Sequence, residues 1–200
     1  MTALLADPIA RQHDIGPGHP EQIARWDAAV KGLGGHPLTP IAPRAATFDE
    51  VALCHAPGYI RSAERDVKSG LSYLTTGDTD ICPASFNVAL HASGLCLNAV
   101  DLVMRGEAGN AFCIVRPPGH HATPDRGMGF CLFNNVAIAA RYAQRRYGVE
   151  RVLIAGTRQV TDVYLLGLAA RHKGTVVSFD RSLAWQGVRG GSARLVQRPG

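Results

Sequence analysis

The chain has 200 residues, of which 46% are hydrophobic, and a formal net charge of +5 at pH 7. This length is typical of one domain, or of one domain and a part, and the hydrophobic content suffices for a buried core. The sequence contains no long uninterrupted apolar run and no secretory pattern in its first residues, so we expect neither a membrane partner nor export. Five scattered cysteines without a CxxC pair favour free thiols and a cytoplasmic location over a disulfide framework or a zinc finger.

The first third of the chain predicts one strand and three helices. The apolar run Ala3–Ala6 predicts a strand, and Gly18–Trp26 begins a helix with a proline and a glutamate in its first turn. Ala46–Arg65 predicts two helices separated by a break at Ala56–Gly58. A turn at Gly77–Asp80 comes next along the chain.

The middle of the chain predicts a helix, a strand, a loop and another helix. Apolar residues at helical spacing predict the long helix Ser85–Met104, and Ala111–Val115 predicts a buried strand. The stretch Arg116–Asn135 contains two prolines in a row, three glycines and the adjacent His120 and His121, which is typical of a shaped loop. Loops that follow strands often carry the site of an α/β protein. A neutral imidazole accepts protons near neutral pH, so the two histidines are either catalytic or simply held by hydrogen bonds in the loop.

The last quarter predicts further strands of a parallel sheet. Arg151–Ala155 and Thr175–Phe179 are apolar and β-branched, and Val163–His172 between them predicts a helix. Strands of this kind suit a three-layer α/β/α fold with a mainly parallel sheet covered on both faces. The connection Gly156–Gly174 is long enough for a parallel crossover. We therefore expect Thr175–Phe179 to pair beside Arg151–Ala155.

Two motifs, RPPGHHA at 116–122 and GFCLFNNVAIAA at 129–140, resemble the histone deacetylase family, including bacterial members that act on acetylated polyamines. The resemblance implies an arginase/deacetylase-like fold and a zinc-dependent amidohydrolase whose partner is an acetyl-lysine or an acetylated amine. By this resemblance His121 would be the general base, and His120 would support it and the developing charge. Gly129, Phe130 and Cys131 would line the substrate channel, with Phe130 as a wall.

Other parts of the chain share this resemblance. The HPE run at 19–21 is similar to the N-terminus of the family, and His55 and Tyr59 form a His-x-Pro-x-Tyr element in which we expect a structural histidine. Asp78 and Asp80 either contact a substrate at the channel rim or serve as plain turn residues.

The resemblance ends at Ala155, and the expected metal ligands are missing. In the family a D-x-D-x-H-H-G run follows this strand, and its second Asp and first His bind zinc. Counting from RVLIA, Arg158 and Val160 occupy those two positions, and an arginine cannot coordinate zinc. Zinc is the cofactor of the family, but we expect it to be absent here. The sequence thus predicts a truncated deacetylase-like domain over 1–155 that is inactive.

Residues 156–200 form a second part with a different resemblance. From about residue 157 they are similar to the C-terminal part of a PIN domain, a fold of many ribonucleases. That resemblance would make Asp162 and Asp180 members of a Mg²⁺ or Mn²⁺ site, although a helix cap and a turn residue are the alternative roles. The expected pairing of Thr175–Phe179 would place both aspartates at the sheet edge that carries His120 and His121. Basic residues are frequent after Arg141, which fits either a solvated surface or, under the ribonuclease alternative only, nucleic acid as a partner.

Overall fold

The computed structural model of the protein describes residues 1–154, 176–177 and 196–197. The chain divides into two compact units, Met1–Val149 and Glu150–Gly200.

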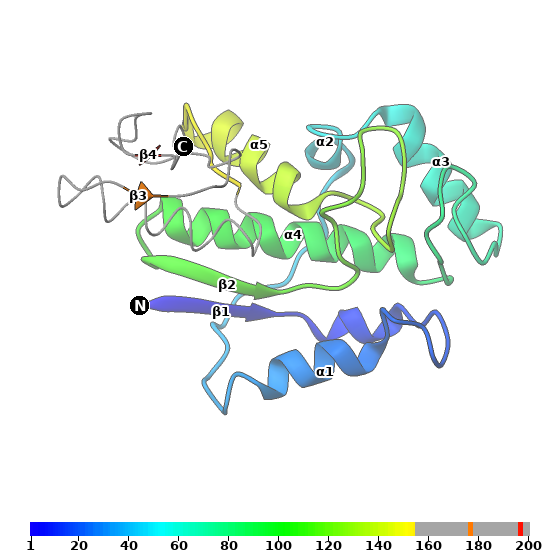
Figure 1. Ribbon diagram of the computed structural model, residues 1–200, viewed down its shortest axis with the longest axis horizontal. Helices are drawn as coiled ribbons and strands as arrows, with labels where there is room; N and C mark the ends of the chain where they lie inside the picture. Colours follow the sequence, from blue (N-terminus) through cyan, green and yellow to red (C-terminus); the bar gives the residue numbers. More distant parts are fainter. Residues whose placement is uncertain (155–175, 178–195, 198–200) are drawn as a thin grey trace. The chain divides into compact units, whose positions relative to one another are not determined.

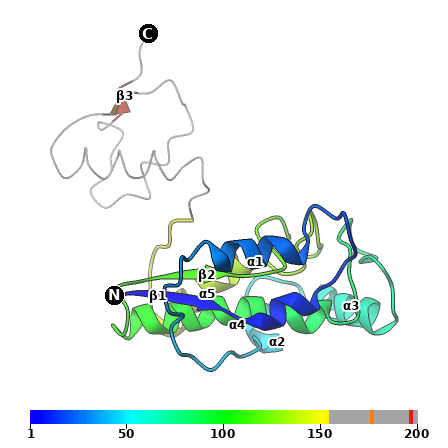
Figure 2. The ribbon, with the colours of Figure 1, turned by 90° about the horizontal axis from the view of Figure 1, so that it is seen from below.

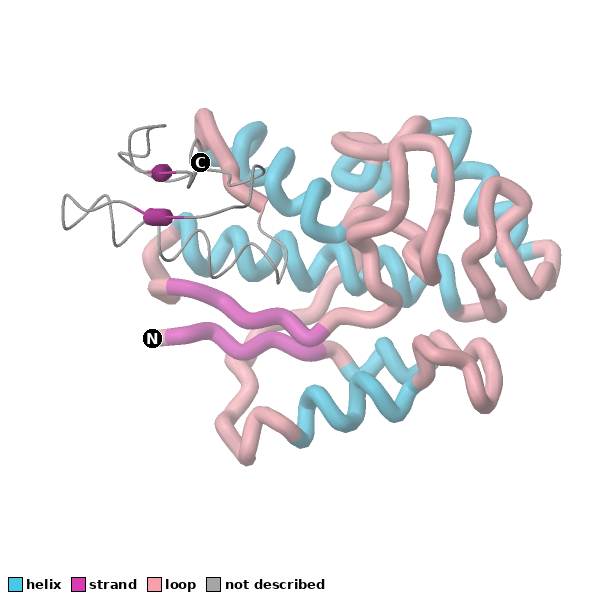
Figure 3. Tube along the Cα trace, in the orientation of Figure 1, coloured by secondary structure: helices cyan, strands magenta, loops and turns pink. Residues whose placement is uncertain are grey.

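The first unit is built around a short parallel sheet. Strand β1, Thr2–Ala6, pairs with β2, Asn110–Ile114, so that Leu5 lies opposite Cys113 (Figure 3). The outer edge of β1 is covered, because Leu4 donates its N–H to the Thr39 hydroxyl at 3.0 Å and accepts the Thr39 N–H at 2.7 Å. The predicted strands near the N-terminus and before the histidine loop are confirmed, as is their parallel direction.

Helices lie on both faces of this sheet. Ala3 and Leu5 pack against α4, whereas Ile114 packs against Trp26 of α1 on the opposite face (Figures 1 and 2). Helix α5 packs on α4, and the largest core cluster, around Phe133, lies among the helices rather than on the sheet. This arrangement confirms the layered α/β fold. The helices are α1 Ile23–Lys31, α2 Phe48–Val51, α3 Pro57–Lys68, α4 Ser85–Met104 and α5 Asn135–Tyr147, with the 3₁₀ helix η1 at Pro8–Gln12.

Helix α4 has a property that the sequence analysis did not anticipate. It is long and apolar enough to cross a membrane by length and composition alone, and 39% of its apolar window is buried in the fold. Core helices of soluble proteins satisfy the same criterion. Here the close approach of α4 to the segment that precedes α2 requires Gly94, since a Cβ there would lie 1.9 Å from the Arg44 carbonyl oxygen.

In the second unit, β3, Val176–Val177, pairs in parallel with β4, Val196–Gln197. Arg151–Ile154 has no regular secondary structure, and all four residues are exposed. The predicted strand there is wrong for these residues. The predicted pairing of Thr175–Phe179 beside it is wrong as well, because Arg151–Ile154 forms no strand and the described residues of the second segment, β3, pair with β4. An apolar β-branched run does not form a strand without a neighbouring strand to pair with. The predicted helix Val163–His172 lies outside the described residues.

Candidate functional site

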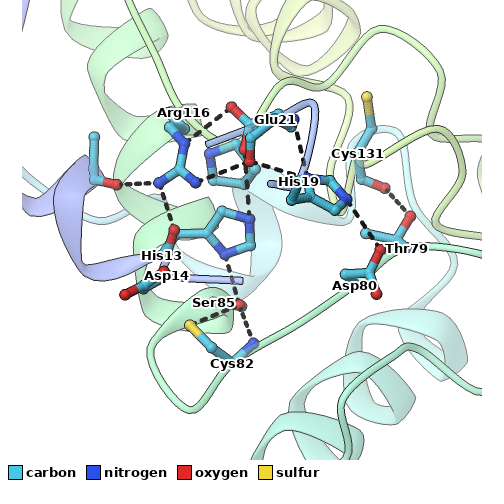
Figure 4. A network of polar contacts seen from close by, with 12 residues as sticks. His13, Asp14, His19, Glu21, Thr79, Asp80, Cys82, Ser85, Arg116 and Cys131 are labelled. Atoms are coloured by element: carbon cyan, nitrogen blue, oxygen red, sulfur yellow. Dashed lines mark hydrogen bonds and ion pairs between the residues drawn. The ribbon is translucent and has the colours of Figure 1, made fainter. Parts of the chain in front are cut away.

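The loop between β2 and α5 begins at a buried arginine. Arg116 is 2% exposed, and its guanidinium donates to the Glu21 carboxylate at 2.9 Å and to the Ala10 carbonyl at 2.9 Å (Figure 4). It also donates to the carbonyls of His13 and Glu21. A charged group is retained in a protein interior when it is paired and fully hydrogen-bonded. Arg116 therefore ties the start of the histidine loop to η1 and to the segment that precedes α1.

His13 and Glu21 complete this buried network. The His13 ring is 0% exposed, with Nδ1 2.7 Å from the Ser85 hydroxyl and Nε2 3.9 Å from a Glu21 carboxylate oxygen (Figure 4). Burial, together with the Arg116 guanidinium, lowers the pKa of His13 to about 4, so the ring is neutral at pH 7. Burial raises the pKa of Glu21, and Arg116 opposes that rise. The network thus holds the ion pair of Arg116 and Glu21 with a neutral imidazole beside it.

The end of the loop is held by the His-x-Pro-x-Tyr element. The Asn134 N–H donates to His55 Nε2 at 2.8 Å, and the Tyr59 hydroxyl donates to the Leu132 carbonyl at 2.6 Å. The Asn134 side chain also caps α5 by accepting the Ala137 N–H at 3.1 Å. Burial lowers the pKa of His55, which keeps its ring neutral and able to accept. These contacts fit the structural role expected for His55.

The two predicted catalytic histidines lie between these fixed ends. His120 and His121 are exposed, and their ring centroids are 4.2 Å apart with the planes tilted by 46°. Within the described residues no side-chain hydrogen bond orients either imidazole. Gly129 lies against His121: a Cβ there would be 2.9 Å from His121 Cδ2, and its φ of +56° also favours glycine. The structure thus brings His121 and Gly129, two of the predicted site residues, together.

The predicted channel wall is held by the Gly77–Asp80 turn. The Gly129 N–H donates to the Asp78 carboxylate at 3.0 Å. Phe130 has a φ of 69°, unusual for a residue with a side chain, and its ring meets the His19 ring edge-on at 4.7 Å. His19 Nε2 lies 3.1 Å from the Asp80 carboxylate (Figure 4). Asp78 therefore contacts the predicted channel wall directly, at Gly129, whereas Asp80 contacts it through His19.

Cys131 differs from its two neighbours in the predicted channel. Its side chain is fully buried, and its thiol donates to the Gly129 carbonyl at 3.4 Å. Burial raises the pKa of this thiol, so it is protonated at pH 7. Cys131 supports the wall from the core, whereas Phe130 is half-buried.

Sequence reasoning missed two contributors to this loop. The first is His19, which belongs to the recognisable HPE run. Its ring contact with Phe130 depends on side-chain geometry and could not be read from the sequence. The second is the ion pair of Arg116 with Glu21, two residues that lie 95 positions apart in the sequence. An arginine directly after an apolar strand was the available signal, because such a charge needs a buried partner.

The residues that could bind a metal do not gather in the described part of the chain. No group of three or more His, Cys, Asp or Glu side chains with suitable placement occurs there, and His13, His19, His120 and His121 do not form one. The positions predicted to matter for metal binding, Arg158, Val160, Asp162 and Asp180, lie outside the described residues, as does the predicted approach of the two aspartates to the histidines. The described residues therefore provide a loop with candidate bases but do not fit a zinc ion.

Comparisons with known proteins agree with the motifs. Residues 19–155 match the family model described as "Histone deacetylase domain". A probable deacetylase of Methanothermobacter thermautotrophicus is 37% identical over 139 residues, which cover 68% of this chain and 41% of that protein. The polyamine deacetylase HDAC10 of Rattus norvegicus is 40% identical over 114 residues, covering 54% of this chain and 19% of that protein.

A solved structure extends the similarity to the fold. The crystal structure of the HDA15 HD domain matches with a TM-score of 0.65 and 31% identity, covering 73% of this chain and 44% of that one. The chain spans about half or less of the length of the curated relatives that it matches.

Proposed function

Because this chain belongs to the histone deacetylase family and has its arginase/deacetylase-like α/β fold, we propose that it binds acylated amines without hydrolysing them by the zinc route. The observation that carries the proposal is the pair Arg158 and Val160 at the two positions where the family has zinc ligands. Three nitrogen or oxygen ligands are the usual minimum for a catalytic zinc.

The retained loop supports binding. Phe130 is half-buried and is held in place by His19, so it presents an apolar wall to an alkyl chain. His121 is exposed beside Gly129 and can accept a proton or a hydrogen bond from an amide. Asp78 is exposed next to this wall and can attract an ammonium group. These features suit an acetyl-lysine or an acetylated polyamine, and one relative is named a polyamine deacetylase.

Hydrolysis requires more than a base. Without a metal ion, water keeps the pKa of bulk water, which is far above the value of about 7 that zinc confers. A neutral imidazole would then have to activate bulk water against an unpolarised amide carbonyl. We therefore expect turnover of acetylated substrates to be absent in this chain.

A metal-binding and turnover experiment tests the proposal. We expect the purified chain, equilibrated with zinc, to retain well below one ion per molecule and to leave acetyl-lysine peptides and acetylated spermidine intact. The double substitution Arg158→Asp with Val160→His restores the two ligand types and is expected to raise zinc affinity. The matched control, Thr157→Asp with Gln159→His, introduces the same residues one position out of register. Stoichiometric zinc in the unaltered chain, or turnover that His121→Ala abolishes, would contradict the proposal.

We propose a metal-dependent ribonuclease of PIN type as the second candidate function. It is favoured by one observation: the predicted strand before Asp180 contains β3, which pairs in parallel with β4. Asp162 and Asp180 would then contribute to a Mg²⁺ or Mn²⁺ site, which also requires waters or further oxygen ligands. RNA cleavage that depends on Mn²⁺ and is lost in Asp180→Asn would support this function. Cleavage that survives in Asp180→Asn would argue against it.

A further inference from the structure

The two edges of the sheet in the first unit differ. The outer edge of β1 is covered by Thr39, which bonds to both backbone groups of Leu4. The sheet contains β1 and β2, so within the described part of the chain no strand pairs with the outer edge of β2. An unpaired strand edge presents its N–H and C=O groups to any further strand that approaches. The outer edge of β2 is therefore the open edge of this sheet.

The alternation of the parallel ladder identifies the backbone groups that face this open edge. Because Leu4 uses its N–H and C=O on the far side of β1, its neighbours Ala3 and Leu5 direct theirs towards β2. In a parallel ladder the residue opposite such a residue directs its own groups away from the pair. Ala111 lies opposite Ala3, and Cys113 lies opposite Leu5. The N–H and C=O groups of Ala111 and Cys113 thus point outwards from the open edge.

The residue between these two is aromatic and exposed. Phe112 is 54% exposed, although Ile114, two positions further on the same face of the strand, is buried against Trp26 of α1. A groove of about 430 Å³, lined in part by Trp26, Ala29 and Val115, lies between α1 and the end of β2. A large apolar side chain on an unpaired strand favours pairing with another chain. The open edge therefore combines outward backbone groups with an apolar contact at its centre.

We propose that the open edge of β2 is a docking site for a second copy of this chain, whose β2 pairs with it in the antiparallel direction across a two-fold axis at Phe112. In that register Ala111 of one copy lies opposite Cys113 of the other, and each residue exchanges both of its backbone hydrogen bonds with its partner. The axis repeats this exchange on its other side. The two Phe112 side chains then form the non-hydrogen-bonded pair, in which opposite side chains are closest. The result is one continuous sheet through both copies, in the order β1–β2–β2–β1.

Two features favour a second copy over an unrelated peptide as the occupant. The outward groups lie symmetrically about Phe112, so the edge is complementary to itself, as a two-fold interface requires. The two ends of the edge also differ in charge: Glu107, 53% exposed, precedes β2, whereas the exposed Arg25 lines the groove at its end. Antiparallel pairing brings the start of one β2 beside the end of the other, so Glu107 of each copy approaches Arg25 of its partner. Opposite charges thus favour the antiparallel direction, and like charges disfavour the parallel one.

Analytical ultracentrifugation of the full chain over a wide range of concentration tests the proposal. We expect a reversible monomer–dimer equilibrium. Ala111→Pro removes an outward N–H, a change that edge strands tolerate, and Phe112→Lys places like charges opposite each other at the axis. Each should weaken dimerisation by about tenfold or more, with an unchanged circular dichroism spectrum. The matched control Val136→Lys adds the same charge at a 44% exposed position of α5 and should leave the dimer intact. A chain that is monomeric throughout, or a dimer that Phe112→Lys and Ala111→Pro do not weaken, would overturn the proposal.

A cross-linking experiment tests the register and does not depend on loss of the dimer. In Phe112→Cys the two introduced thiols meet at the axis, where Cβ atoms about 5 Å apart can be bridged after a small approach. Mild oxidation should therefore give a disulfide-linked dimer. The matched control is Asn110→Cys, because Asn110 would lie opposite Ile114 of the other copy and its two thiols would be far apart. The unaltered chain supplies the background from its five native cysteines. Equal cross-linking in both variants, or cross-linking through position 110 alone, would exclude this arrangement.

Discussion

Two apolar runs of this chain have similar composition and different structures. Ala111–Ile114 belongs to β2, which pairs with β1 and packs against α4 and α1, and Ile114 is 7% exposed. Arg151–Ile154 is apolar at three of its four positions but forms no strand, and Ile154 is 57% exposed. A strand therefore requires a partner and a covered face as well as β-forming residues. The difference bears on function, since the first run leads to the histidines and the second leads to the positions where the family has its zinc ligands.

The largest expected effect comes from breaking the contact that fixes the first run. Arg116→Met removes the guanidinium and leaves the Glu21 carboxylate buried without its charge partner. We expect the free energy of unfolding to fall by about 4 kcal/mol, as for other buried ion pairs that lose one member. Urea denaturation of the purified variant measures this change in the free energy of unfolding.

The matched control is Arg11→Met, because Arg11 pairs with Asp27 at 2.8 Å on the surface, where its side chain is 59% exposed. Only a small change is expected there, and equal losses in both variants would refute this account of Arg116.

The same substitution in each run tests the comparison directly. Ile114→Ala empties a site that is packed against Trp26 and Ala10, and we expect a loss of about 3 kcal/mol in unfolding free energy. Ile154→Ala removes an exposed side chain, and we expect a loss below about 0.5 kcal/mol. Chemical denaturation of both variants gives the two values. If Ile154→Ala were as costly as Ile114→Ala, the second run would be buried in solution and the contrast between the runs would be wrong.

The buried network should also make stability depend on pH. The pKa of His13 is lowered from 6.5 to about 4 on folding, so the unfolded chain binds the proton first as the pH falls. Stability from this group is complete above pH 6.5 and is lost as the pH falls towards 4. The raised pKa of Glu21 acts in the opposite sense, because protonation of that carboxyl stabilises the folded state.

The expected net loss between pH 6.5 and pH 4 is less than the roughly 3 kcal/mol that His13 alone would give, because Glu21 opposes it. Unfolding measured across this range should show the loss in the unaltered chain. His13→Gln, which cannot titrate, should show a smaller loss or a gain. A variant with the same pH dependence as the unaltered chain would exclude His13 as the cause.

Much of the fold could be predicted from the sequence because local patterns determine it. Helical spacing predicted α4, and two apolar runs predicted β1 and β2. The run at Arg151–Ile154 could not be distinguished from these by composition, since the difference lies in a neighbouring strand that its own residues do not encode. Pairing is a property of two segments, so a pattern in one of them is insufficient.

The candidate site was predictable in part for the same reason. The motif around His120 and His121 is contiguous in sequence and could be recognised. The contacts that support it are not contiguous: Arg116 reaches Glu21, Asp78 accepts from Gly129, and Tyr59 donates to Leu132. Which charged residue is buried, and with which partner, depends on the three-dimensional arrangement.

The smallest expected effect concerns the glycine beside His121. Gly129 and Gly148 both have positive φ, 56° and 67°, so alanine at either position should cost about 1 kcal/mol of backbone strain. They differ in space: a Cβ at Gly148 meets nothing within 4 Å, whereas one at Gly129 would lie 2.9 Å from the His121 ring. His121 is exposed, so its ring can turn away and the additional loss of stability should be small. The ring itself should move, and the imidazole NMR signals of His121 should therefore shift in Gly129→Ala but not in Gly148→Ala. Unchanged His121 signals in both variants would mean that Gly129 does not position this histidine, and the glycine would then be required only for its backbone conformation.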